Sequence, residues 1–83
     1  MNTTNVLKWI ENLPAVDGSN VQNILFAAKR EEVLALVKRA ENLNEDEARN
    51  VRNDAYLAAL KIESDARKIW GDEEINLAKA NGL

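Results

Sequence analysis

The chain has 83 residues and a formal net charge of −3, and it contains neither histidine nor cysteine. These absences exclude the commonest general base and metal ligand, disulfide bonds and thiolate chemistry. A chain this short forms one domain and buries only about 60% of its unfolded surface. We therefore expect a single helical domain over residues 1–83, with association as one way of covering apolar faces that remain.

The N-terminal stretch lacks the basic start and the apolar run of a secretory signal. No apolar segment approaches the roughly 20 residues that a membrane span needs. We therefore expect a cytoplasmic protein that does not enter a membrane. The pairs Lys29-Arg30 and Lys38-Arg39 point to different sides of their helix and are interspersed with acids, so nucleic acid is not an expected partner.

The first segment predicts a short helix from Thr4 to about Leu13, with Thr3 or Thr4 as its N-cap. One face carries the apolar residues Val6, Trp9, Ile10 and Leu13. Pro14 should end this helix, because the residue before proline is pushed out of the helical region. Residues 14–18 should then form the connecting turn.

The second helix should begin at Ser19, which forms a capping box with Gln22, and should end at about Asn42. Its apolar residues fall on two stripes about 90° apart. The first stripe holds Val21, Ile24, Leu25 and Ala28, and the second holds Val33, Leu36, Val37, Ala40 and Leu43. Two interpretations remain open: one wide buried face, or a bend near Ala28 to Glu31.

The third helix should run from Glu45 to Trp70, with Asn44 and Glu47 as its capping box. The connection is so short that residues 19–43 and 44–70 should form an antiparallel helical hairpin. The pairs Glu45 with Arg49 and Glu63 with Arg67 are ordered favourably for i,i+4 ion pairs.

After Gly71, a natural helix end, Asp72-Glu73-Glu74 predicts the start of a tail helix that runs to about Ala80. Its candidate anchors are Ile75, Leu77 and Ala78. The fold class is thus all-α: a long antiparallel helical hairpin with a short helix at each end packed on it. We expect this small helical bundle to form oligomers.

The third helix carries an alanine stripe, which should face the second helix: Ala48, Ala55, Ala58, Ala59 and Ala66. Tyr56, Leu57 and Leu60 point away from that stripe. Contiguous large apolar residues are seldom left in water, so these three predict a self-association interface with a second copy. The alternative is a monomer in which the first helix lies across Tyr56 and Leu60.

No nucleophile pair, carboxylate pair, phosphate loop, metal site or cofactor motif can be identified, so we expect no enzyme. The profile predicts a small interaction protein, a regulator, inhibitor or adaptor of a larger protein. The alternative is an oligomer that sequesters an anionic molecule such as a nucleotide between subunits. Its candidate ligand-binding residues are Trp9, Lys29, Tyr56 and Arg67, since aromatic rings can stack on a base and cations can hold phosphate.

Overall fold

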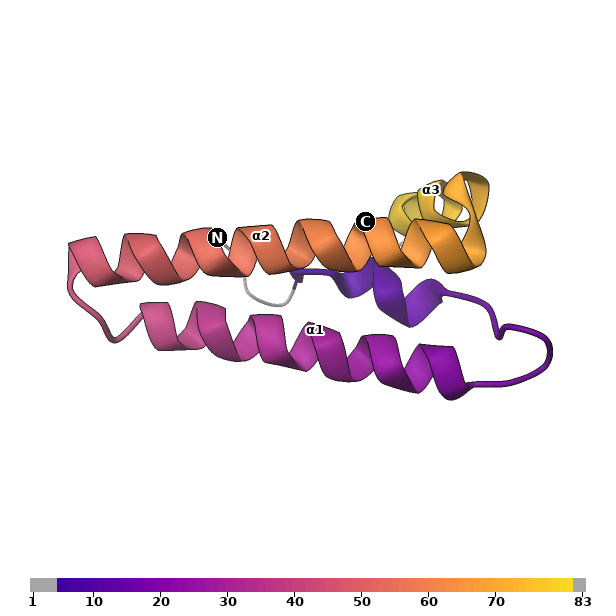
Figure 1. The fold of residues 1–83 in the computed structure, drawn as a ribbon, viewed down its shortest axis with the longest axis horizontal. Coiled ribbons are helices and arrows are strands. Elements are labelled where there is room, and N and C mark those ends of the chain that lie inside the picture. Colours follow the sequence, from indigo (N-terminus) through magenta and orange to yellow (C-terminus); the bar gives the residue numbers. More distant parts are fainter. Residues whose placement is uncertain (1–4, 82–83) are drawn as a thin grey trace.

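A computed structural model of the chain describes residues 5–81 and contains no strand among them. Its elements are η2 (Lys8–Asn12), α1 (Val21–Ala40), α2 (Glu45–Trp70) and α3 (Asp72–Asn81). The hairpin of α1 and α2 sets the long dimension of 44 Å. We call the end opposite its connecting loop the base; η2 lies toward the base, and α3 folds back beside the end of α2 (Figure 1). The predicted all-α hairpin with a short helix at each end is confirmed.

The N-terminal helix differs from the prediction, because η2 is a five-residue 3-10 helix that begins at Lys8. Leu7 adopts a left-handed conformation with φ of 52°, which interrupts the helical path. The Val6 carbonyl accepts a hydrogen bond of 2.8 Å from the Arg30 Nε, and the Ile10 amide bonds instead to the Leu7 carbonyl. An α-helix over Thr4–Leu13 is therefore wrong.

The predicted end of this segment is confirmed, since Leu13 is extended directly before Pro14, with φ of −74° and ψ of 137°. The candidate N-caps Thr3 and Thr4 lie outside the described residues.

A two-residue turn joins this segment to α1. Val16 and Ser19 exchange backbone hydrogen bonds of 3.1 and 2.9 Å around Asp17 and Gly18. Both central residues have positive φ, 51° and 74°, as the Asp-Gly sequence favours in a type I′ turn. The Ser19 hydroxyl accepts from the Val21 amide at 3.2 Å, so the predicted capping box with Gln22 is wrong and the helix begins at Val21.

The helix α1 runs without a break through Ala28 to Glu31 and ends at Ala40 (Figure 1). Its buried residues, Phe26, Val33 and Ala40, recur every seven residues and form one seam. That seam continues the second predicted stripe.

The first predicted stripe faces solvent instead. Val21, Ile24 and Leu25 are 59%, 67% and 49% exposed. Phe26 follows Ile24 by two residues, or about 200° on a helix, so burying Phe26 turns Ile24 outward. A wide buried face on α1 is therefore wrong.

The start of α2 follows the prediction, because the Asn44 Oδ1 accepts from the Glu47 amide at 2.9 Å. The alanine stripe faces inward, with Ala48, Ala55 and Ala66 buried. The helix ends where Gly71 takes a φ of 90°, and the Gly71 amide bonds to the Arg67 carbonyl at 2.9 Å.

Aromatic packing closes the base of the hairpin. The rings of Phe26 and Trp70 meet edge to face, with centroids 5.1 Å apart. The Trp70 Nε1 donates to the Pro14 carbonyl at 2.8 Å, and the Asn23 Nδ2 donates to the Leu13 carbonyl at 2.9 Å. These two bonds fix the Leu13-Pro14 segment against both long helices.

The tail helix α3 docks by Ile75 and Ala78, both buried, whereas Leu77 is 51% exposed and does not anchor it. Charges of α2 also reach α3: Glu63 pairs with Lys79, and Arg67 with Asp72 at 3.1 Å. These contacts replace the predicted pair of Glu63 with Arg67.

The other predicted pair on α2 is also missing. Within residues 5–81, Glu45 and Arg49 form no ion pair. Lys61 and Asp65 supply an i,i+4 pair on this helix instead, at 3.3 Å.

Candidate functional site

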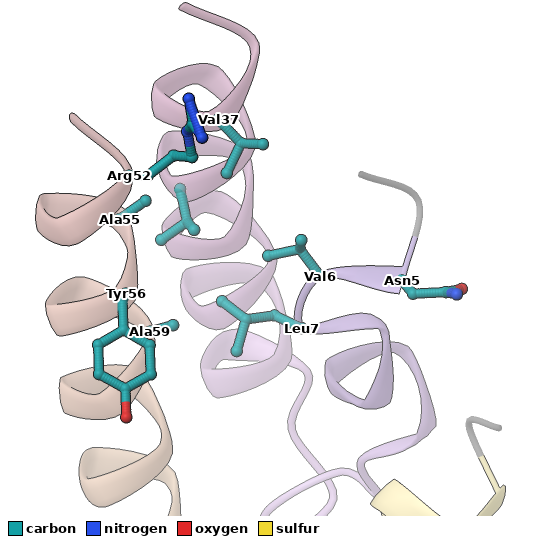
Figure 2. Close-up of a pocket in the computed structure, with 9 residues that line it drawn as sticks. Asn5, Val6, Leu7, Val37, Arg52, Ala55, Tyr56 and Ala59 are labelled. Carbon is teal, nitrogen blue, oxygen red and sulfur yellow. The ribbon is translucent and has the colours of Figure 1, made fainter. Parts of the chain in front are cut away.

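A groove of about 520 Å³ opens between α1, α2 and the segment that precedes η2 (Figure 2). We call it the α1/α2 groove. Its walls are mostly aliphatic, and its lining residues are Asn5, Val6, Leu7, Val33, Val37, Arg52, Ala55, Tyr56 and Ala59.

The groove is open for two reasons: the residues that line α2 are small, and η2 begins too late in the chain to cover this side of the hairpin. On α2 the wall is made of small residues, Ala55 and Ala59, which leave space opposite Val33 and Val37 of α1. The 3-10 helix begins only at Lys8 and covers the hairpin near its base. Among residues 5–81, therefore, only α1 and α2 make up the half of the hairpin nearer its connecting loop (Figure 1).

A single charged side chain, Arg52, is among the nine that line the groove. Figure 2 places it at one end beside Val37, with Tyr56 and Ala59 further along α2 and Leu7 on the opposite wall. Arg52 is exposed and forms no ion pair or hydrogen bond within the described part of the chain. The site is thus an apolar channel with one unpaired cation at its end.

Tyr56 is 62% exposed and lines the groove, and Leu57 and Leu60 beside it on α2 are 54% and 46% exposed and lie outside the groove. We call these three residues the α2 face. The monomer alternative, in which the N-terminal helix crosses Tyr56 and Leu60, is not what the structure shows. Instead, η2 turns Trp9 and Ile10 into the interior.

The other candidate ligand residues do not gather around Tyr56 in one chain. Trp9 is buried in the core, and the Lys29 amino group lies over the Phe26 ring, 5.5 Å from its centroid. Arg67 is engaged by Asp72 and Asn76 of α3. Whether two chains together form the predicted cleft stays a prediction.

Sequence reasoning missed Arg52 and the side of the groove formed by Val33 and Val37. In the sequence, Val37 is recognisable only as a member of the second apolar stripe, and Arg52 belongs to no motif. Nothing local identifies the groove, because it depends on the left-handed Leu7, which starts η2 at Lys8 and lies far from α1 and α2 in sequence.

Residues 5–81 hold no group of three or more histidine, cysteine, aspartate or glutamate side chains placed to bind a metal ion. Within the same range, no helix has both the length and the apolar character required to cross a membrane.

Fold and site together define a small all-α hairpin protein with an uncovered apolar groove. The chain belongs to the family described as uncharacterized KorC-regulated protein A, whose model matches residues 2–82. Two relatives from Escherichia coli, each named Protein KleA, are 29% identical to it. One alignment spans 75 residues and 90% of both chains; the other spans 79 residues, 95% of this chain and 94% of the relative. No solved structure matches the chain.

Proposed function

We propose that this protein is a cytoplasmic, non-enzymatic interaction protein that self-associates and acts on a larger protein as a regulator, inhibitor or adaptor. The observation that carries the proposal is the exposure of the α2 face. Leu60 lies four residues after Tyr56 and three after Leu57, so its side chain joins the other two into one patch. Such patches mark interaction sites more often than scattered surface leucines do.

The size of the patch bounds the strength of self-association. Burying the exposed halves of these three side chains in both copies contributes about 6 kcal/mol. A micromolar dimer needs a net free energy of about 8 kcal/mol, and lost translational and rotational freedom costs roughly 4–15 kcal/mol more, so the three side chains supply at most about half of what is required. Neighbouring groups must therefore take part, and Asn53 and Ser64 are exposed at helical spacing on either side of the patch. They would form the polar rim of an α2-to-α2 contact.

Sedimentation equilibrium from 1 to several hundred micromolar tests self-association. The wild-type mass should rise with concentration, and Leu57→Asp should hold it at one chain, since a buried unpaired carboxylate is strongly unfavourable. Leu77→Asp is the matched control, because Leu77 is a similarly exposed leucine on α3. A wild-type mass of one chain throughout, or equal dissociation by both variants, would contradict the proposal.

One further observation supports the non-enzymatic part of the proposal. The polar side chains that line the groove are Asn5, Arg52 and Tyr56, which include no activated nucleophile or general base. The family description calls its members KorC-regulated, and we propose that this chain is itself under that control, which is a separate matter from the protein on which it acts. Recovery of a stoichiometric protein partner by the wild type, but not by Leu57→Asp, tests the adaptor role.

The second candidate function is sequestration of an anionic molecule, such as a nucleotide, by the oligomer. The unpaired guanidinium of Arg52 at an open groove favours it. A thermal-shift screen tests it, because a ligand at 100 times its dissociation constant adds about 2.7 kcal/mol of stability. No shift with any nucleotide or other anion would remove this candidate.

A further inference from the structure

We propose that the α1/α2 groove binds a single-chain amphiphile, an aliphatic carboxylate whose hydrocarbon chain fills the groove and whose head group pairs with Arg52. The groove shares Tyr56 with the α2 face, whereas Leu57 and Leu60 do not line it. The proposed ligand is a narrower class of anion than the one named in the second candidate function, and a single chain is sufficient to bind it.

The walls of the groove suit a hydrocarbon chain. A volume of about 520 Å³ lies within the range of roughly 300–1,000 Å³ that is usual for small-ligand sites. Six of the nine lining residues are aliphatic: Val6, Leu7, Val33, Val37, Ala55 and Ala59. Water against these side chains finds few hydrogen-bond partners, so an apolar chain displaces it favourably.

The charge at the groove selects the head group. No acidic side chain lines it, and Arg52 is left without a protein partner in the described residues. A guanidinium binds a carboxylate through two parallel hydrogen bonds. A nucleotide fits less well, because one cation cannot match several phosphates and the walls offer few donors to a base and sugar.

The position of Arg52 sets the direction of the ligand. Figure 2 shows Arg52 beside Val37 at one end of the groove, while Tyr56, Ala59 and Leu7 lie toward the other end. The head group therefore sits near the hairpin loop, and the chain runs past Ala59 between the Tyr56 ring and Leu7.

Titration calorimetry with monomeric dodecanoate, below its micelle concentration, tests the site. We expect one molecule per chain, with affinity falling roughly fourfold for each methylene removed on going to decanoate. Dodecanol and dodecyltrimethylammonium should bind at least tenfold more weakly than dodecanoate, because neither carries a negative charge that can pair with the Arg52 guanidinium.

Variants locate the ligand. Arg52→Gln should weaken dodecanoate about tenfold and leave dodecanol unchanged, as expected when a charge-assisted hydrogen bond is lost. Arg49→Gln is the matched control, because Arg49 lies one turn earlier on α2 and does not line the groove. Ala59→Leu should fill the groove and abolish binding; if it unfolds the chain, Val37→Thr, of similar shape but polar, should weaken binding instead.

The same titration in the Leu57→Asp protein separates this inference from the proposed self-association. Undiminished binding by a single-chain species supports the groove site whatever the oligomer does. Absence of binding, equal binding of all three head groups, indifference to Arg52→Gln, or binding only to anionic phospholipid vesicles would overturn it.

Discussion

Arg30 fastens the N-terminal segment to α1, and replacing it should both destabilise the protein and open the groove. Its side chain is only 12% exposed, and its Nε donates to the Val6 carbonyl at 2.8 Å. A hydrogen bond from a charged donor contributes about 1.5–3 kcal/mol, and the Val6 carbonyl would lose its partner. We expect Arg30→Met to lower the free energy of unfolding by about 2 kcal/mol, since methionine keeps most of the packing.

The ion pair of Arg30 with Glu11, at 3.3 Å, should contribute far less, because Glu11 is 56% exposed. Glu11→Gln is therefore the control, with an expected loss below about 1 kcal/mol. Urea denaturation followed by circular dichroism measures the free energy of unfolding of both variants. In thermal denaturation, Arg30→Met should lower the melting temperature by about 10 °C. Equal losses for the two variants, or no loss for Arg30→Met, would refute the account of how Val6 and Leu7 are held as a groove wall.

Three further substitutions test the fold. Asn44→Ala removes the cap of α2 and should lower the free energy of unfolding by about 1 kcal/mol in urea denaturation; an unchanged midpoint would show that the cap is not formed. Trp70→Phe keeps an aromatic ring but loses the bond to the Pro14 carbonyl, which should cost about 1 kcal/mol by thermal denaturation, and a stabilised variant would contradict that bond. Ile75→Ala empties a fully buried site and should cost about 2–4 kcal/mol, with faster amide exchange in α3; a loss below 1 kcal/mol would mean that α3 is not docked.

The elements with local signals could be predicted from the sequence. Asn44 and Glu47 define the start of α2 through contacts only three residues apart, and Gly71 defines its end. The acids after Gly71 correctly indicate α3. In each case the deciding interaction lies within one helical turn, which a sequence pattern records directly.

The N-terminal segment and the groove could not be predicted in this way. The left-handed Leu7 is accompanied by the bond from Arg30 to the Val6 carbonyl, which joins residues 24 apart. Likewise, the apolar spacing of Val21 and Ile24 cannot tell which side of α1 will face α2. The choice is made by Phe26, whose ring packs against Trp70 across the hairpin.

Cross-linking at the α2 face tests the central claim, that this surface joins two copies, most directly. Because the chain has no cysteine, Leu57→Cys introduces a single thiol. In a two-fold contact centred on the α2 face, the two thiols approach each other, and mild oxidation should convert most of the protein to a disulfide-linked dimer at micromolar concentration. Leu77→Cys, on α3, should remain largely monomeric under the same conditions. Equal cross-linking at both positions, or none at Leu57→Cys, would contradict self-association through this face.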